Sequence, residues 1–520
     1  MRAGPTVRYN DRMRVRHLLC PVPVLLACAL LFACGSDTPA ETSTPTVGTT
    51  AIPSPAHVAT ARLLNWTEFG LNPQRSDASP LSSGITAANV AHLHRVTVNL
   101  PGTVDSSPIY LHEASVAGAT RSVVVVTTTY GKTLALDPTS GRILWTFTPA
   151  GYGVWAGSAQ ITVSSPLADP DGRFVYAASP NGLIHKLSLT DGHEVHTGGW
   201  PVSVTRDATH EKLGAALNID GPYVIVATSG YLGDIPTYQG HVVLIERTSG
   251  RIASVFNTLC ANRRQLIVPR SCAASDSAIL SRGGAVVEPD GGRLLISTGN
   301  GPWNGTTNFG DSVIELTLPN LRYRQAFTPT NQAELNEDDL DLGSSAPVLL
   351  GQDRAMVAGK DGVMRVLSLS RLDGHQPAAP NQLGGELQRL PLPGGGELFS
   401  APAVWTAPAG PHKSASTTVF IGAEHATAAY ALVDGRLRLV WQNDNPGTSP
   451  VLASGVLYVY DPAGGGIYVY RPRSGRPIAK LAGSPGHWNS PIVADGHVIE
   501  PEGDANEHKT SGKLDLFTAR

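Results

Sequence analysis

The chain has 520 residues, of which 41% are hydrophobic and 16% are charged, and it contains 55 Gly and 40 Pro. This abundance of turn-forming residues fits an all-β protein better than a helical one. The formal net charge is −3, with 39 Lys and Arg against 42 Asp and Glu, which excludes the broad basic surface of a nucleic-acid-binding protein. We therefore expect no nucleic-acid partner.

The first 33 residues read as an export signal. Arg12, Arg14 and Arg16 are followed by an apolar run over residues 18–33, which ends at Leu31-Phe32-Ala33-Cys34. This ending resembles the lipobox of bacterial lipoproteins, so we expect a signal peptide over residues 1–33 and lipidation of Cys34. An uncleaved membrane anchor is the alternative, although the run is short and contains two prolines. Either way we expect a membrane-anchored protein outside the cytoplasm, in the periplasm or at the cell surface.

Residues 34–62 are rich in Ser, Thr, Pro and Ala and carry few large apolar side chains. Such a segment buries too little apolar surface to offset the entropy lost on ordering. We expect a disordered tether here, followed by a folded domain over residues 63–520.

A short motif recurs along the folded domain: a small residue, Pro, and an aliphatic residue. Six copies contain the proline and two do not, and the eight copies are Ser107-Pro108-Ile109, Ser165-Pro166-Leu167, Ala215-Ala216-Leu217, Gly284-Ala285-Val286, Ala346-Pro347-Val348, Ala401-Pro402-Ala403, Ser449-Pro450-Val451 and Ser490-Pro491-Ile492. Their spacing, roughly 40 to 70 residues, suits a four-stranded propeller blade with variable loops.

Each repeat also has an internal order of strands and turns. In the first repeat a β-branched run over residues 123–126 precedes a Gly turn, an alternating run over residues 133–136, a second turn, and a strand that ends in Trp145. We expect an eight-bladed β-propeller of four-stranded antiparallel blades, or seven blades if one of the proline-free copies is a loop. Because a propeller must close, residues 94–100 should pair with the last strand, residues 514–517.

The pattern Ala135-Leu136-Asp137-Pro138-Thr139-Ser140-Gly141-Arg142-Ile143-Leu144-Trp145 resembles the tryptophan-docking repeat of the pyrroloquinoline-quinone (PQQ) dehydrogenase superfamily. In that superfamily the Trp wedges between neighbouring blades, and Trp441 holds a similar place in a later repeat. The opening Asn65-Trp66-Thr67-Glu68-Phe69-Gly70 also resembles these proteins, so the resemblance covers roughly residues 64–520. It implies a site over the central channel where enzymes hold PQQ, calcium as a Lewis acid, and an Asp as general base.

Cys260 and Cys272 are the two cysteines that follow the predicted lipidation site at Cys34. They enclose a short loop in a chain that we expect to reach an oxidising compartment, so we predict a disulfide between them. A zinc site is the alternative, but two thiols without a His cluster make a poor one.

Three motifs stand where the resemblance implies site residues. Thr298-Gly299-Asn300-Gly301-Pro302-Trp303-Asn304 resembles the stretch whose first Asn ligates calcium, which makes Asn300 a candidate ligand of metal and cofactor. Asp338-Asp339-Leu340-Asp341 resembles the Asp-x-Trp-Asp stretch of the catalytic base, which makes Asp338 and Asp341 candidates. Lys360 stands where a cation bonds the quinone oxygens. The alternatives are a Gly-Asn-Gly turn, a solvated acidic loop and a Lys-Asp-Gly hairpin turn, respectively.

Other features weaken the catalytic interpretation. The calcium-binding Glu of the superfamily falls on Ile235, with Asp234 beside it as a substitute metal ligand. Arg282 stands near the expected aromatic floor of the cofactor, and no adjacent Cys-Cys pair follows the signal. We therefore favour a non-catalytic binding or assembly scaffold for an envelope protein partner or a small ligand. A PQQ- and calcium-dependent oxidoreductase that acts on an alcohol or sugar is the alternative.

Overall fold

The computed structural model describes residues 62–231, 235–374, 382–407, 415–504 and 507–519. The predicted signal peptide, the lipidation of Cys34, nearly all of the tether and the metal ligand Asp234 lie outside the described residues. No described helix is both long and apolar enough to cross a bilayer. The helices are short: α1 (Tyr152–Trp155), α2 (Gln332–Glu337), η1 (Val90–His92), η2 (Pro269–Ser271) and η3 (Leu342–Ser344).

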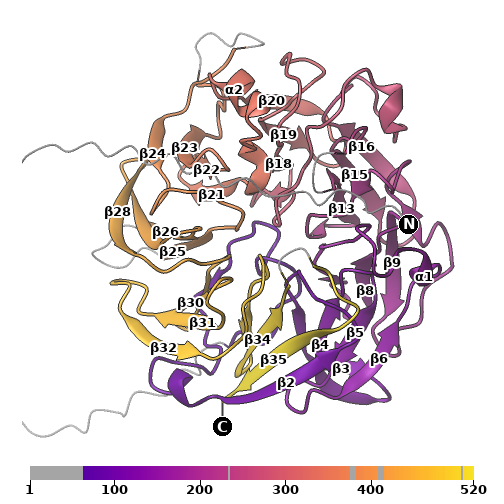
Figure 1. The fold of residues 1–520 in the computed structure, drawn as a ribbon, viewed down its shortest axis with the longest axis vertical. Helices are drawn as coiled ribbons and strands as arrows, with labels where there is room; N and C mark the ends of the chain where they lie inside the picture. The colour runs from indigo at the N-terminus through magenta and orange to yellow at the C-terminus, as the bar shows by residue number, and fades with distance from the viewer. Residues whose placement is uncertain (1–61, 232–234, 375–381, 408–414, 505–506, 520) are drawn as a thin grey trace, which may run out of the picture. The chain divides into compact units, whose positions relative to one another are not determined.

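Eight antiparallel sheets stand around a central channel as the blades of a propeller (Figure 1). From the channel outward, blades one to four are β3 (Ile109–Val116), β4 (Ala119–Thr127), β5 (Thr133–Leu136) and β6 (Ile143–Phe147); β7 (Leu167–Ala168), β8 (Phe174–Ala178), β9 (Leu183–Ser188) and β10 (Val202–Ser203); β12 (Asn218–Asp220), β13 (Tyr223–Ala227), β15 (His241–Glu246) and β16 (Ile252–Asn257); β17 (Val286–Val287), β18 (Arg293–Ser297), β19 (Val313–Thr317) and β20 (Tyr323–Phe327).

Blades five to eight continue the ring in the same order. They are β21 (Val348–Gly351), β22 (Arg354–Val357), β23 (Val363–Ser368) and β24 (Gln388–Pro391); β25 (Ala403–Ala407), β26 (Ser416–Gly422), β27 (Thr427–Val433) and β28 (Arg436–Asn443); β29 (Val451–Ala453), β30 (Val456–Tyr460), β31 (Ile467–Tyr470) and β32 (Pro477–Leu481); β33 (Ile492–Ala494), β34 (His497–Glu502), β35 (Gly512–Thr518) and β2 (His94–Leu100). A small sheet of β11 (Glu211–Lys212) and β14 (Ser229–Gly230) lies apart from the blades, and β1 (Ala78–Ser79) joins blade seven as a parallel fifth strand.

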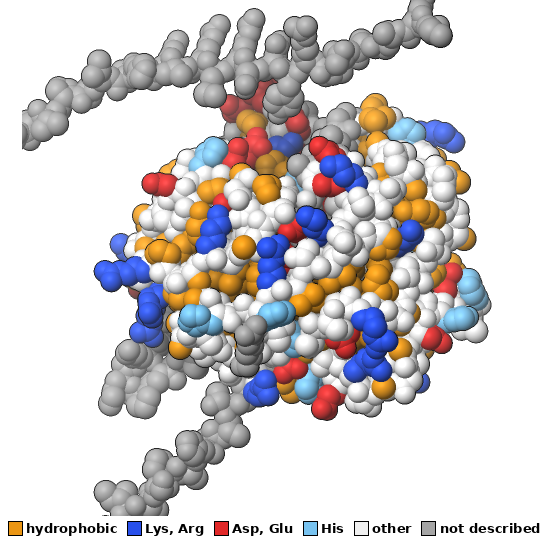
Figure 2. Space-filling model, turned by 60° about the horizontal axis from the view of Figure 1, so that its bottom comes forward, with side chains coloured by type: hydrophobic (Ala, Val, Ile, Leu, Met, Phe, Trp, Pro, Cys, Tyr) orange, Lys and Arg blue, Asp and Glu red, His pale blue; other side chains and the backbone are white. Residues whose placement is uncertain are grey.

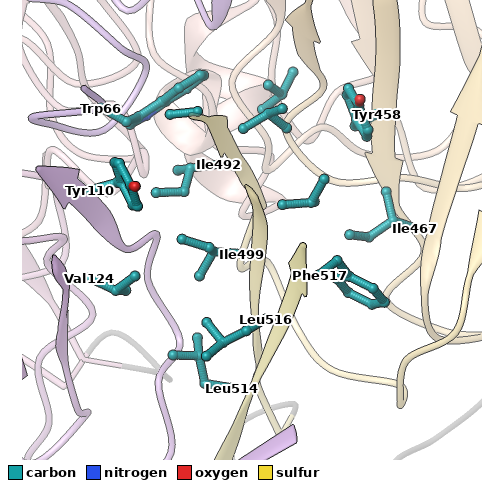
Figure 3. Packing of buried hydrophobic residues seen from close by; sticks show 14 of the residues in the cluster. Trp66, Tyr110, Val124, Tyr458, Ile467, Ile492, Ile499, Leu514, Leu516 and Phe517 are labelled. Atoms are coloured by element: carbon teal, nitrogen blue, oxygen red, sulfur yellow. The ribbon is translucent and has the colours of Figure 1, made fainter. Parts of the chain in front are cut away.

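Each predicted start motif directly precedes or opens the innermost strand of a blade, so the eight-bladed prediction is confirmed and the seven-bladed alternative is wrong. The predicted closure is also confirmed, because β2 pairs antiparallel with β35 from His94 opposite Thr518 to Leu100 opposite Gly512. A shared apolar cluster packs blade eight against blade one, with Tyr110 and Val124 from blade one on one side and Ile492, Ile499 and Leu516 from blade eight on the other (Figure 3).

The predicted tryptophan docking joins two pairs of blades. Trp145 at the end of blade one donates its indole N–H to the carbonyl of Leu189 in blade two at 2.9 Å. The ring covers Gly192, where a Cβ atom would lie 2.6 Å from the ring carbon Cε3 and where φ is +75°. Glycine is therefore needed at this turn both for the left-handed backbone and for the close approach of the ring. Trp441 repeats the arrangement in blade six, with its indole N–H on the carbonyl of Pro472 at 2.7 Å.

The antiparallel order gives the propeller two different ends. What we call the hairpin end carries the turns that join first to second strands and third to fourth strands, such as residues 453–456 and 471–476. What we call the loop end carries the segments that join second to third strands and one blade to the next, such as residues 298–312 and 328–347. Acidic, basic and apolar side chains are interspersed on the face that Figure 2 shows.

An N-terminal segment, residues 63–84, crosses the hairpin end and is called the strap below. Its carbonyl groups accept backbone N–H groups from innermost strands of several blades at 2.8–2.9 Å, as shown by the pairs Thr67 with Ala168, Pro73 with Val287, Ser76 with Val404 and Asp77 with Leu452. Its two ends bond the hairpin of blade eight, where Leu63 accepts from Asp495 and Ser83 accepts from Gly496. The strap thus ties non-adjacent blades together across one end of the channel.

We predict that Trp145→Ala destabilises the propeller by about 3–5 kcal/mol, because the substitution leaves a cavity between blades one and two and an unpaired carbonyl at Leu189. The midpoint of urea unfolding should fall accordingly. Val154→Ala is the matched control, because Val154 is 83% exposed and its loss should leave the midpoint nearly unchanged. Equal midpoints for the two variants would contradict the docking role.

Candidate functional site

Three of the predicted site residues meet at the loop end of blades four and five. Asn300 follows β18, Asp341 lies in the segment between the two blades, and Lys360 follows β22. One carboxylate oxygen of Asp341, Oδ1, accepts the backbone N–H of Asn300 at 2.8 Å, and Oδ2 contacts Nζ of Lys360 at 2.5 Å. Lys360 also contacts Oδ1 of the exposed Asp339 at 2.9 Å. The structure therefore brings together the residues that resemble a calcium ligand, a base and a cation.

Glycines make this close arrangement possible. A Cβ atom on Gly299 would lie 2.1 Å from Oδ1 of Asp341, and one on Gly359 would lie 2.2 Å from the carbonyl oxygen of Asp341. Neither residue tolerates a side chain, because real Cβ atoms do not approach other atoms so closely. Gly299 and Gly359, which directly precede Asn300 and Lys360, therefore allow Asp341 to lie against the backbone of both blades.

Burial and charge act in opposite directions on this ion pair. Burial raises the pKa of Asp341 to about 6, against the opposing effect of the Lys360 ammonium. Burial lowers the pKa of Lys360, but the carboxylates of Asp341 and Asp339 outweigh burial and raise it above its ordinary value. Above about pH 6 Asp341 is therefore ionised and neutralised by Lys360.

The other predicted base, Asp338, does not join this group. It is exposed at the C-terminal end of α2, where its backbone N–H donates to the carbonyl of Glu334. Asp311, which the sequence interpretation missed, does join. Its Oδ1 accepts the backbone N–H of Leu342 at 3.2 Å, and burial raises its pKa to about 8. The available signal was a Gly-Asp turn directly ahead of a strand, which many structural turns share.

The donor set of these residues does not fit calcium in the way that the resemblance implies. Calcium takes about six to eight oxygen ligands. Oδ1 of Asn300 is a buried oxygen without a hydrogen-bond partner, as a vacant ligand would be, but both oxygens of Asp341 are already engaged. Among the described residues, no three His, Cys, Asp or Glu side chains are close enough together to hold a metal ion.

A second charged group occupies the loop end of the channel at the predicted cofactor floor. The guanidinium of Arg282 donates to Oδ2 of Asp105 at 2.9 Å and lies 5.6 Å from the centre of the Trp488 ring. Asp105 also contacts Nδ1 of His487 at 2.7 Å. Burial would raise the pKa of Asp105, but Arg282 and His487 outweigh burial and lower it. The expected aromatic floor is therefore replaced by an ion-paired arginine, which does not fit a flat quinone stacked on a ring.

Two other side-chain groups, a Ser-His-Glu series and a pair of cysteines, contain residue types that act as nucleophiles in enzymes, but both are engaged within the protein. Oγ of Ser179 lies 2.6 Å from Nε2 of His185, whose Nδ1 contacts Glu194, which is the hydroxyl, imidazole and carboxylate order of hydrolases. Ser179 is fully buried, however, and its hydroxyl also contacts Asn181 at 2.5 Å. Cys260 and Cys272 form a disulfide in the structure. Neither group presents a reactive atom to a substrate.

Comparisons with known proteins agree with this architecture. A family described as "Outer membrane protein assembly factor BamB" matches residues 86–265, about a third of the chain. A europium-containing methanol dehydrogenase is similar with a TM-score of 0.62 and 14% identity, over 88% of this chain and 98% of that chain. The quinohemoprotein alcohol dehydrogenase of Comamonas testosteroni is similar with a TM-score of 0.60 and 14% identity, over 89% of this chain and 81% of that chain.

The quinohemoprotein alcohol dehydrogenase ADHIIG of Pseudomonas putida HK5 is similar with a TM-score of 0.61 and 13% identity, over 88% of this chain and 80% of that chain. No curated protein matches the sequence. At such identities the likeness shows the fold alone. The predicted resemblance to PQQ-like propellers is confirmed at that level.

We predict that Asp311→Asn removes a pH-dependent loss of stability. Because folded Asp311 keeps its proton up to about pH 8, whereas an unfolded Asp loses it near pH 4, the free energy of unfolding falls as pH rises across this window. The asparagine variant lacks this titration and also tolerates the φ of +48° at residue 311. Its stability relative to the unsubstituted protein should rise by more than about 1 kcal/mol between about pH 5 and about pH 8.

Urea unfolding at several pH values measures this difference. Asp338→Asn is the control, because Asp338 is exposed, and it should not alter the pH profile. A constant difference between Asp311→Asn and the unsubstituted protein across this range would mean that Asp311 ionises normally.

Proposed function

Because the chain has the PQQ-like propeller fold, we propose that it is an exported, membrane-anchored lipoprotein that binds a protein partner or small ligand at its loop end without catalysis. One observation carries the proposal: the charged groups at the dehydrogenase-like positions are already paired. Asp341 contacts Lys360 at 2.5 Å, and Arg282 contacts Asp105 at 2.9 Å. Each oxygen of the Asp341 carboxylate already accepts from a protein group, Oδ1 from the Asn300 backbone N–H and Oδ2 from Lys360, so a substrate hydroxyl would have to compete with these partners.

The loop end offers a hollow suited to binding. A cavity of about 250 Å³ lies between the loops of blades five to eight, and its walls include Phe399 and Trp488, whose rings stack at 4.3 Å. Glu397 and Glu424 supply carboxylates at the same cavity. Aromatic walls with a few polar groups are typical of recognition sites in proteins. The strap crosses the opposite end, so the loop end is the accessible side of the channel.

We predict that a photo-crosslinking amino acid at His425 captures the natural partner in the cell envelope. His425 is next to the cavity residue Glu424, and its side chain is 56% exposed. The matched control is Gln352, which is exposed in a hairpin of blade five at the hairpin end. A discrete adduct from residue 425 and none from residue 352 is the expected outcome. The same set of adducts from both ends would contradict recognition at the loop end.

A second prediction concerns the anchor. Cys34→Ser should abolish labelling by a fatty-acid probe and move the protein from the membrane fraction to the soluble fraction, because the thiol that would carry the lipid is gone. Cys28→Ser, within the apolar run of the signal, is the control and should leave both readouts unchanged. Persistent membrane association of the Cys34→Ser protein, without lipid labelling of either form, would favour the uncleaved anchor.

The alternative is a PQQ- and calcium-dependent oxidoreductase that acts on an alcohol or sugar. The convergence of Asn300, Asp341 and Lys360 at one end of the channel favours it. Dye reduction with an alcohol or sugar by protein given PQQ and Ca²⁺, abolished by Lys360→Gln, would establish this alternative and displace the first proposal. The absence of both quinone binding and dye reduction would exclude it.

A further inference from the structure

A second cavity, of about 430 Å³, lies at the hairpin end between the strap and blades six and seven. Its apolar walls come from three parts of the chain: Pro80 and Ala87 after β1, Trp405 in blade six, and Leu452 and Ile478 in blade seven. The volume lies within the range of about 300–1,000 Å³ that small-molecule sites occupy. The apolar part of the cavity is therefore large enough for a hydrocarbon or aromatic group.

The polar side chains of this cavity are mainly hydrogen-bond donors. Arg471 and Arg473 line it from the turn between β31 and β32, and a guanidinium can only donate. No carboxylate of the described residues forms an ion pair with either arginine, and no Asp or Glu lines the cavity. The indole N–H of Trp405 is buried and has no hydrogen-bond partner among the described residues.

These observations point to one class of ligand. Unpaired guanidinium groups bind carboxylate and phosphate oxygens through charge-assisted hydrogen bonds. A buried donor without a partner carries a free-energy cost that an acceptor atom on a ligand would remove. The apolar walls add the requirement of a non-polar group beside the anionic one.

We propose that this cavity binds an amphiphilic anion, a carboxylate or phosphate ester attached to an aliphatic or aromatic group. Arg471 and Arg473 hold the anionic head, and Pro80, Ala87, Leu452 and Ile478 cover the tail. The site lies at the opposite end from the loop-end cavity and does not depend on the function proposed above. The same chemistry is found in a free metabolite and in an anionic lipid, and the experiment separates these sources.

Isothermal titration of the purified chain with dodecyl phosphate, below its critical micelle concentration, tests the proposal. We expect saturable binding with one site per chain, at least about tenfold weaker binding of inorganic phosphate, and no binding of dodecyltrimethylammonium, which has the same tail and the opposite charge. Binding of the cation as tightly as the phosphate ester would overturn the proposal, as would the absence of saturable binding to dodecyl phosphate.

Two variants test the named residues. Arg471→Gln/Arg473→Gln should weaken dodecyl phosphate binding at least about tenfold, because each substitution removes a charge-assisted hydrogen bond. Arg142→Gln/Arg322→Gln is the matched control, since it removes two exposed arginines from the corresponding turns of blades one and four and should not change the affinity. Ala87→Phe keeps all charges and should block the tail. Unchanged affinity in both Arg471→Gln/Arg473→Gln and Ala87→Phe, with unfolding midpoints intact, would refute the site.

Vesicles distinguish the two sources of the ligand. If the anion is a lipid headgroup, the unsubstituted chain binds phosphatidylcholine vesicles that contain phosphatidylglycerol, it does not bind pure phosphatidylcholine vesicles, and the Arg471→Gln/Arg473→Gln variant loses the binding. If the ligand is a free anion, dodecyl phosphate binds but neither kind of vesicle does. Vesicle binding that survives the double substitution would assign membrane binding to another surface and would contradict a lipid in this cavity.

Discussion

The strap depends on one buried side chain, the guanidinium of Arg75. It donates to the carbonyl of Gly283 at 3.1 Å, to that of Leu217 at 2.8 Å and to the carboxylate of Glu68 at 2.9 Å. Burial alone would make an isolated charge very costly here, and Glu68 supplies the counter-charge. Burial raises the pKa of Glu68 to about 7, against the opposing effect of Arg75. Each charge is therefore costly to bury alone, and the two stabilise each other. The hydrogen bonds of Arg75 hold the strap against the segments that lead into blades three and four.

Fixing the strap decides what each end of the propeller can do. Innermost strands of four separate blades donate backbone N–H groups to strap carbonyls, so the strap covers the hairpin end of the channel with paired backbone groups. The segment beyond the strap continues to β2, the outermost strand of blade eight, so the same stretch of chain also closes the ring. The strap leaves the loop end of the channel uncovered, and the charged residues there form ion pairs within the chain, Asp341 with Lys360 and Arg282 with Asp105. The path of the strap therefore determines which end of the channel is open to a partner, and this links the fold to the proposed function.

The periodic features of the fold could be predicted from the sequence. The start motifs predicted the position of each innermost strand, because a small residue and a proline suit the entry into a blade. The Gly and Trp of the docking repeat predicted the hairpin turn and the contact of the Trp with the next blade. The strap could not be predicted, since its bonds use carbonyl groups, which every residue carries, and its path has no repeat.

The candidate site was predictable only where motifs preserved it. Asn300, Asp341 and Lys360 were found because each lies in a recognisable motif, and the structure brings them together. Asp338 was predicted from the same motif as Asp341, but it lies at the end of α2, where it is exposed to solvent and does not join them. The pair of Arg282 and Asp105 is separated by 177 residues, so no local pattern could reveal that the arginine is already neutralised.

Native-state hydrogen exchange tests most directly whether the strap couples the blades. The backbone N–H groups of Ala168, Val287, Val404 and Leu452 belong to four different blades, and all donate to the strap. If the strap is one cooperative unit, these four amides share a single free energy of opening, and Arg75→Met lowers it for all four while β4 in blade one keeps its protection. Four unrelated opening energies, or a loss confined to one blade in the variant, would contradict the account.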